Sequence, residues 1–355
     1  MNETKRKVLV VEDSLVAQKL LRRMIMNDTR FELIGVVDDG KQACEFVSRF
    51  SPDVISMDLL MPVMDGVEAT REIMRENPVP VVIVSSFYQT SEIDMAIRVM
   101  EAGAVSILPR PFGPGHPKYE QSSKQYLNTL KSMSEIKVVK RKREEPKKSK
   151  PYTSITKSVS SEEFSNRNFK VLAIGASAGG PEGLSTILSS LPIDFPVPVF
   201  VVQHIDGHFA DSFATWLNNL SQMPVSIAVN GEKALAGHVY LPPGHHQMIV
   251  NKNGTISTQK EDMTKHLCPS VDVLFKSIAQ VYGNNSMAVL LSGMGKDGVA
   301  ELKNLYDLGA YTMVQDENTS MVYGMPGEAV KIGATCKVLP PASIVLEINQ
   351  LINKK

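Results

Sequence analysis

The sequence is poor in the features that mark secreted, zinc-bound and membrane proteins. It has three cysteines in 355 residues, an odd number without C-x-x-C spacing, so we expect neither disulfides nor a structural zinc site. Its apolar runs are short, such as VPVFVV (197–202), and none approaches the roughly 18 residues that cross a membrane. The first residues, MNETKRKVLVVED, do not have the pattern of a signal peptide. These absences predict a cytoplasmic protein without membrane insertion.

The net charge is zero, but the charge is unevenly distributed. Residues 140–168 hold nine basic and four acidic residues, are rich in serine and threonine, and contain almost no large aliphatic side chains. Such a segment cannot bury enough surface to offset the entropy lost on ordering, which predicts a flexible basic linker. A nucleic-acid-binding arm is the alternative. Acids and prolines interrupt the run and no aromatics interleave it, so we expect no nucleic-acid partner and two domains, 1–139 and 169–355.

Residues 1–139 alternate between strand-like and helix-like patterns. The strand-like runs cover 7–11, 31–37, 53–57, 79–85 and 105–108. Helical patterns lie around 15–27, 41–50 and 91–102, and an amphipathic stretch contains Tyr126, Leu127, Leu130 and Met133. This alternation predicts an α/β domain with an open, doubly wound parallel sheet, whose chemistry lies at the carboxyl ends of the strands.

Acidic side chains follow two of these strands. Glu12 and Asp13 end the first strand and Asp58 ends the third, while Ser85 and Arg110 follow the fourth and fifth. A single acid here could be a solvated loop cap. Three carboxylates at one edge repel one another unless a cation joins them, and an all-oxygen set suits Mg²⁺. A carboxylate beside Mg²⁺ can attack a phosphoryl group, so the cluster predicts phosphoryl chemistry.

The first domain resembles the flavodoxin-like receiver domains of bacterial response regulators in VVEDS (10–14), MDLLMPVMDG (57–66), Ser85 and RPF (110–112). The resemblance implies that Asp58 is the phospho-acceptor, that Glu12 and Asp13 hold Mg²⁺ with it, and that Ser85 senses the phosphoryl group. Receivers usually carry lysine where Arg110 stands. A planar guanidinium is not a lysine's point charge, so we expect acceptor chemistry with altered switching.

After the linker, strand–helix alternation resumes and predicts a second, three-layer α/β domain. Its first strand runs into VLAIGASAGGPEG (171–183), which could cradle a phosphate or present Ser177 as a nucleophile. A dinucleotide loop needs G-x-G-x-x-G, and its next strand should end in a ribose-binding acid rather than His204. Gly175 to Gly179 instead fits G-x-S-x-G, a strand-to-helix turn that projects a hydroxyl at the sheet edge.

A base and an acid occupy neighbouring strand ends. His204 ends VPVFVVQH (197–204) and Asp297 follows MAVLLS (287–292) in the loop GMGKDG. A histidine can take the proton of Ser177, and a carboxylate can orient that histidine. The glycine-rich loop can aim backbone N–H groups at an oxyanion. The order Ser, His, Asp differs from that of α/β-hydrolases. We expect the other histidines of this domain to be structural, namely His208, His238, His245, His246 and His266.

Residues 170–335 resemble the catalytic domain of chemotaxis protein-glutamate methylesterases, the CheB family, in AIGASAGG, VVQH, VYLPPG, PSVDVLF, LSGMGKDG and QDENTSMVYGMPGEA. The resemblance implies Ser177 as nucleophile, His204 as base, Asp297 as orienting acid and the Met294 N–H in the oxyanion hole. It also implies hydrolysis of receptor glutamate methyl esters to methanol and deamidation of particular glutamines, without a cofactor in this domain. The implied partners are the cytoplasmic helices of chemoreceptors and a histidine kinase as phosphodonor.

Four positions depart from that family. Ala178 follows the nucleophile where a hydroxyl residue is frequent, Cys268 and Gly327 stand where arginines are usual, and Gln247 falls where many members carry histidine. The triad is intact, so the departures bear on substrate choice more than on reaction class. They also motivate the alternative of a response regulator whose second domain only binds a partner.

Overall fold

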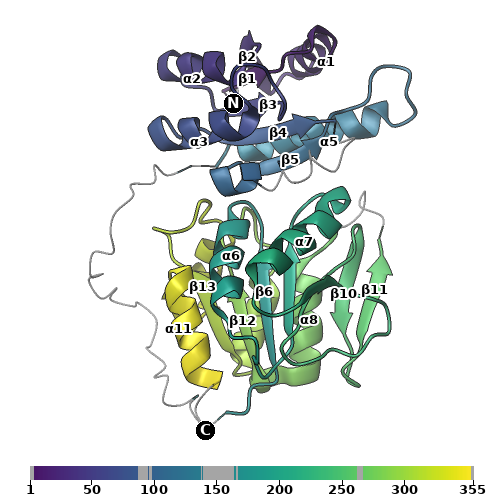
Figure 1. Ribbon diagram of the computed structural model, residues 1–355, viewed down its shortest axis with the longest axis vertical. Coiled ribbons are helices and arrows are strands. Elements are labelled where there is room, and N and C mark those ends of the chain that lie inside the picture. Colours follow the sequence, from purple (N-terminus) through teal and green to yellow (C-terminus); the bar gives the residue numbers. More distant parts are fainter. Residues whose placement is uncertain are drawn as a thin grey trace. The chain divides into compact units, whose positions relative to one another are not determined.

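A computed structural model describes residues 4–86, 98–136, 167–261 and 267–352, together with Met95, Val138 and Phe164. The chain divides into two compact units, Met1–Glu145 and Pro146–Lys355, whose elements are labelled in Figure 1. In the described residues no helix is both long and apolar enough to cross a membrane.

The first unit is a five-stranded parallel sheet in the order β2-β1-β3-β4-β5, which confirms the predicted doubly wound fold. Its strands are β1 (Arg6–Val11), β2 (Phe31–Val37), β3 (Val54–Met57), β4 (Val81–Ser85) and β5 (Ser106–Pro109). Its helices are α1 (Leu15–Met26), α2 (Gly40–Arg49), α3 (Gly66–Glu76) and α5 (Tyr119–Met133). The helix predicted at 91–102 lies partly outside the described residues.

Local sequence explains where these elements begin. The β-branched runs of β1, β3 and β4 are buried, as expected of strands covered on both faces. Ser14, Asp39 and Asp65 cap α1, α2 and α3, each accepting a hydrogen bond from a backbone N–H of the first turn. The caps start α1 and α2 shortly after β1 and β2 end, and α3 after a longer loop that follows β3. Glu12, Asp13 and Asp58 lie in the segments that directly follow β1 and β3, at that edge of the sheet.

The second unit is a seven-stranded parallel sheet in the order β14-β13-β12-β6-β7-β9-β8, with a separate antiparallel pair, β10 and β11. The strands are β6 (Val171–Ala176), β7 (Val199–Gln203), β8 (Val225–Ile227), β9 (Val239–Leu241), β10 (His246–Val250), β11 (Ile256–Lys260), β12 (Ser286–Leu290), β13 (Tyr311–Gln315) and β14 (Lys337–Leu339). The helices are α6 (Gly180–Ser190), α7 (Ala210–Leu220), α8 (Val271–Tyr282), α9 (Val299–Asp307), α10 (Met325–Lys331) and α11 (Pro341–Ile352), with short 3-10 turns at Gly207–Phe209 and Gly283–Asn285.

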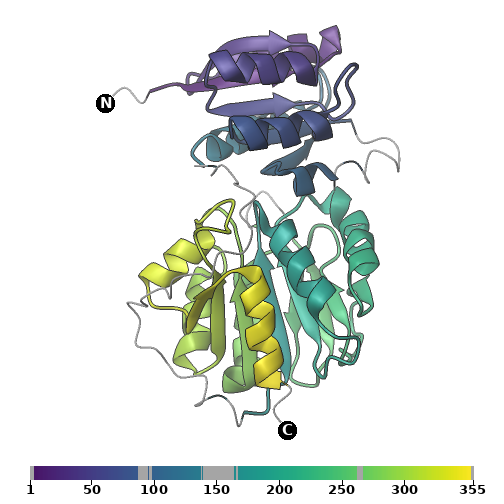
Figure 2. The ribbon, with the colours of Figure 1, turned by 60° about the vertical axis from the view of Figure 1, so that its left-hand side comes forward.

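Helices cover both faces of this sheet, which confirms the predicted three-layer architecture. Leu172 and Ile174 of β6 join a core with α6, α7 and α11, whereas Val171 and Ala173 join a second core with α8, α9 and α10. Successive side chains of a strand point to opposite faces of the sheet, so the side chains of a fully apolar strand pack in both cores. Figure 1 shows α6, α7 and α11 in front of the sheet and α8 behind it, and Figure 2 shows α11 from another side.

Most of the predicted linker, 140–168, lies outside the described residues. Three of its last residues are described, and two of them contact the second unit. Phe164 is buried with its ring edge-on to that of Tyr311, at 4.7 Å between centroids. Arg167 donates hydrogen bonds to the backbone carbonyls of Asn284 and Gly309.

Candidate active site

The turn between β6 and α6 presents Ser177 at the carboxyl edge of the sheet. Gly179 makes the turn with φ +74°, and a Cβ there would lie 2.4 Å from Cβ of Met321, so only glycine fits. The Ser177 N–H donates to the Ser292 carbonyl (3.0 Å) and the Ser177 carbonyl accepts from the Gln203 amide (2.8 Å). Its backbone is therefore fixed, while its side chain makes no hydrogen bond to the described residues.

His204 and Asp297 form a close pair on the same edge. Nε2 of His204 lies 2.7 Å from Oδ2 of Asp297, and the two side chains are 15% and 13% exposed. The His204 N–H donates to the carbonyl of Ala176 (2.9 Å), which brings the end of β7 beside the residue preceding Ser177. When Nε2 donates to Asp297, Nδ1 is the nitrogen that remains to accept a proton. The three predicted strand-end residues thus gather at one edge.

The amino-terminal end of α8 holds Asp297 in place. The carboxylate accepts hydrogen bonds from the Ser270 hydroxyl (2.7 Å) and from the backbone N–H groups of Val271 (2.6 Å) and Asp272 (3.2 Å). Burial pushes the pKa of Asp297 upward, but the hydrogen bonds from His204, Ser270 and Val271 and the charge of His204 bring it below its ordinary value. The positive end of the helix dipole favours the same ionised form. Asp297 is therefore a stable anion facing His204.

Gln247 supports this arrangement from β10. Its side chain is buried; it accepts a hydrogen bond from the Ser270 N–H (2.8 Å) and donates to the Leu267 carbonyl (2.7 Å) and to Glu261 (3.1 Å). In the sequence Gln247 stands out only as a departure from the family, and Ser270 does not stand out as a site residue. A serine just before an apolar helical run was the available signal for Ser270, because it marks a helix cap.

The loop after β12 comes against Ser177. A Cβ on Gly293 would lie 2.7 Å from Cβ of Ser177 and 2.3 Å from the sulfur of Met325, so the Gly293 backbone touches the serine directly. Met294 is the next residue, and its N–H donates to no described residue. The predicted oxyanion donor is thus one residue from the contact with Ser177.

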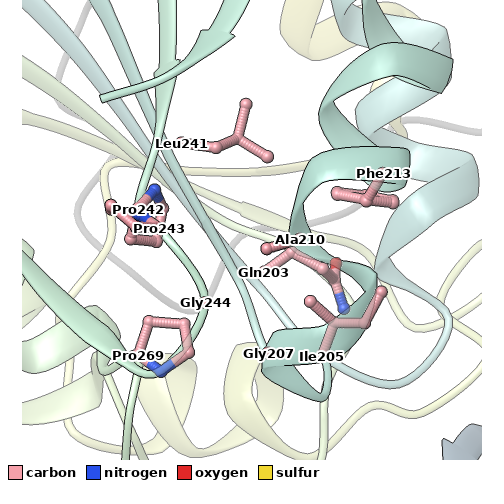
Figure 3. Close-up of a pocket in the computed structure, with 10 residues that line it drawn as sticks. All are labelled: Gln203, Ile205, Gly207, Ala210, Phe213, Leu241, Pro242, Pro243, Gly244 and Pro269. Carbon is pink, nitrogen blue, oxygen red and sulfur yellow. The ribbon is translucent and has the colours of Figure 1, made fainter. Parts of the chain in front are cut away.

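A small, mostly apolar pocket is lined by residues that are neighbours of His204 and Ser270 in the chain. Figure 3 shows the residues that line it, which are Gln203, Ile205, Gly207, Ala210, Phe213, Leu241, Pro242, Pro243, Gly244 and Pro269. Gln203 and Ile205 flank His204 in the chain, and Pro269 precedes Ser270. Cys268 and Gly327, the two family departures from arginine, are both buried. The pocket walls are therefore mostly apolar, and neither Cys268 nor Gly327 is among the residues that line them.

The first unit gathers its predicted residues as well. Ligand oxygens of Glu12, Asp13 and Asp58 all lie within 4.8 Å of one another, which fits the all-oxygen set that Mg²⁺ prefers. Nη2 of Arg110 is 2.9 Å from Oδ2 of Asp58 and 2.9 Å from Oε2 of Glu12. Ser85, at the end of β4, favours the ionised form of Asp58 and so lowers its pKa against the effect of burial.

The electrostatics of this cluster favour a cation. Burial, reinforced by the charge of Asp58, raises the pKa of Glu12 to about 7. Burial also raises the pKa of Asp58, against the opposing effects of Arg110 and Ser85. Two buried carboxyl groups that resist ionisation together gain from an additional positive charge.

Comparison with known proteins covers both units. Residues 172–348 match the family described as CheB methylesterase, and residues 8–117 match the response regulator receiver domain. A protein-glutamate methylesterase/protein-glutamine glutaminase of Geobacter metallireducens is 43% identical over 98% of this chain and 99% of its own length. One of Hahella chejuensis is 44% identical over 97% and 98%. The crystal structure of the Thermotoga maritima CheB methylesterase catalytic domain is 34% identical, covers 52% of this chain and 99% of its own, and has a TM-score of 0.50. The chain therefore belongs to the CheB methylesterase family, with a response regulator receiver domain preceding the catalytic domain.

Proposed function

We propose that the protein hydrolyses glutamate methyl esters on the cytoplasmic helices of chemoreceptors, releasing methanol, and deamidates particular receptor glutamines. The observation that carries the proposal is the His204–Asp297 pair, 2.7 Å apart, on the strand edge that presents Ser177. The names of the full-length relatives support this reaction class. A receptor substrate of this kind requires a cytoplasmic location.

The residues fit a two-step acyl transfer. The Ser177 oxygen attacks the ester carbonyl while His204 takes the hydroxyl proton, and Asp297 stabilises the resulting imidazolium. The Met294 N–H donates to the oxyanion of the tetrahedral intermediate. Collapse of the intermediate breaks the ester bond, and His204 returns the proton to the departing methoxide as methanol. Water then attacks the acyl-enzyme with His204 again as base, which regenerates Ser177 and frees the glutamate. Ammonia replaces methanol when the substrate is glutamine.

Methanol release from labelled, methylated receptor tests the proposal against a purely binding second domain. We expect release by the wild type and a loss on the order of 10⁴ to 10⁶ in kcat for Ser177→Ala, His204→Ala or Asp297→Ala, by analogy with serine protease triads. The losses should not add when the substitutions are combined. Ser189→Ala, an exposed serine on α6, is the matched control. If Ser177→Ala kept more than about a tenth of the rate, the nucleophile would lie elsewhere.

We propose further that Asp58 is phosphorylated by a histidine kinase and that Glu12, Asp13 and Asp58 hold Mg²⁺. Bound Mg²⁺ supplies positive charge that offsets the negative charge of the incoming phosphoryl group. Arg110, which contacts Asp58, and Ser85, at the end of the strand next to β3, are candidates to pair with the phosphoryl oxygens. The protein should be labelled by a small phosphodonor, and EDTA or Asp58→Asn should abolish labelling. Asp53→Asn, at the opposite end of β3, is the control; labelling of Asp58→Asn at the wild-type level would refute the assignment.

A further inference from the structure

A second group of polar side chains lies beside the candidate active site. Asp206 and His208 follow β7, His245 lies between β9 and β10, and one ligand-type atom from each lies within 4.8 Å of the others. The proposed hydrolysis uses none of the three. We infer that these three residues bind a divalent first-row transition metal ion, such as Zn²⁺, which links the two loops.

The side chains are close to the geometry such an ion requires. Nδ1 of His208 lies 2.6 Å from Oδ1 of Asp206, and the rings of His208 and His245 are 5.3 Å apart at 80°. Zinc binds nitrogen and carboxylate oxygen at about 2.0–2.2 Å, which places tetrahedral ligands about 3.3 Å apart. The three ligand atoms already lie within 4.8 Å of one another, so metal binding would require each to move by only a short distance.

The backbone holds the two loops together independently of any metal. A Cβ on Gly244 would lie 2.2 Å from the carbonyl oxygen of Gly207, and a Cβ on Gly207 would lie 2.7 Å from the ring of His245. His245 itself has φ +60°, a left-handed conformation that is uncommon for a residue with a side chain. Such conformations persist where the surroundings enforce them and cluster at functional sites. The loops therefore place the His245 ring over Gly207 before any ligand arrives.

The donor set determines the class of ion. Two imidazoles and one carboxylate suit Zn²⁺, Co²⁺ or Ni²⁺, whereas Mg²⁺ and Ca²⁺ prefer oxygen ligands only. The His208 side chain is 71% exposed, so water can complete the coordination. Asp206 also accepts a hydrogen bond from the His208 N–H (3.1 Å), which fixes the carboxylate in the way that supporting contacts orient metal ligands.

The site lies at the edge of the pocket. Gly207 and Gly244, one from each loop, are among the residues that line it in Figure 3. An ion held by His208 and His245 would join the two loops next to the pocket wall. Bound metal should accordingly restrict movement of the pocket edge. The competing explanation is that Asp206 and His208 form only a surface ion pair.

Cobalt binding distinguishes the two explanations. Full-length protein without a polyhistidine tag is titrated with Co²⁺ in the presence of excess Mg²⁺, which occupies the oxygen site of the first unit. We expect one equivalent of Co²⁺ with visible bands typical of nitrogen ligation, displaced by Zn²⁺. His208→Gln and His245→Asn should each weaken binding at least about tenfold. Asparagine is chosen at 245 because it tolerates the left-handed backbone. Fluorescence of Trp216, the single tryptophan, reports that each variant is folded.

Two control variants locate the ion. His238→Gln, in the same unit, should bind Co²⁺ like the wild type, and so should His204→Gln. Unchanged affinity in both His208→Gln and His245→Asn would overturn the inference. Loss of binding in His204→Gln but not in His208→Gln would also overturn it, because the ion would then occupy the catalytic pair. If the wild type showed no nitrogen-ligated Co²⁺, the inference would be wrong, and Asp206 and His208 would form only a surface ion pair.

Discussion

The side-chain oxygen of Gln247 lies 2.8 Å from the backbone nitrogen of Ser270 and accepts its hydrogen bond. The Ser270 hydroxyl in turn donates to Asp297, whose other oxygen faces His204. The orienting acid is therefore held through a relay that begins on β10, outside the main sheet. The relay ties the start of α8 to the loop after β12, so the position of Asp297 depends on residues outside the Ser177–His204–Asp297 set.

Removing the Ser270 hydroxyl should loosen Asp297. A hydrogen bond to a charged group contributes about 1.5–3 kcal/mol, so Ser270→Ala should lower kcat roughly tenfold to a hundredfold. KM should stay near the wild-type value, because Ser270 is not expected to contact substrate. Steady-state kinetics on methylated receptor measure both constants. Ser270→Thr, which retains the hydroxyl, should restore most of kcat, and a threonine variant as impaired as alanine would argue against the positioning role.

A methyl group on Gly293 should displace the nucleophile. The added Cβ would lie 2.7 Å from Cβ of Ser177 and 2.3 Å from the Met325 sulfur, closer than real side chains approach. We expect Gly293→Ala to reduce methanol release by at least about a hundredfold, because misplacement of about 1 Å has that effect. Gly183→Ala is the control on α6, where the added Cβ comes no closer than 3.2 Å to a neighbour. Equal activity in the two variants would contradict the proposed contact.

The positions of Ser177, His204 and Asp297 could be predicted from sequence, because the carboxyl ends of parallel strands lie at the same edge of a sheet. Ser177 and His204 follow β6 and β7, which are adjacent in the sheet, and Asp297 follows β12 on the other side of β6. The hydrophobic pattern located those strands well, since each is fully buried and almost entirely apolar. The three-residue strands β8 and β14 are too short for any periodicity to be read.

The contacts that complete the site could not be predicted in this way. Ser270 reaches Asp297 across 27 residues, and that contact depends on how α8 packs rather than on any local pattern. Gln247 lies on β10, in a two-stranded antiparallel pair that sequence analysis did not identify. His208 and His245 were predicted to be structural because each was considered alone, and only the fold brings them together with Asp206. His266 lies outside the described residues.

The pKa of Asp297 leads to a prediction about acid stability. The folded-state pKa lies below the ordinary value of 3.8, so the folded protein holds the ionised form more strongly than the unfolded chain does. The stabilisation is complete above the unfolded pKa and is lost as the pH falls through the folded pKa. Asp297→Asn should therefore be less stable than the wild type at pH 6, and the difference should shrink below about pH 4. Urea unfolding followed by Trp216 fluorescence measures this in the catalytic unit. A difference independent of pH would show that Asp297 acts through packing alone.

The link between the two units leads to the last prediction. The composition of residues 140–168 predicts a flexible linker, which would not transmit strain but would keep the two units at high effective concentration, so that even a weak contact would be occupied. We expect the unphosphorylated first unit to cover the edge that carries Ser177, and phosphorylation of Asp58 to weaken that contact. A modest contact of a few kcal/mol implies partial activation.

Two proteins test this, the full chain and a fragment of residues 160–355, which keeps Phe164 on Tyr311. The fragment should have higher basal methylesterase activity than the unphosphorylated full chain, because nothing covers its Ser177 edge. A small phosphodonor should stimulate the full chain and leave the fragment unchanged, and Asp58→Asn in the full chain should keep the low basal rate. A fragment no more active than the unphosphorylated full chain would exclude simple occlusion. The phosphorylated receiver would then have to stimulate methylesterase activity directly. In that case the phosphodonor would act only while the first unit remains attached to the second.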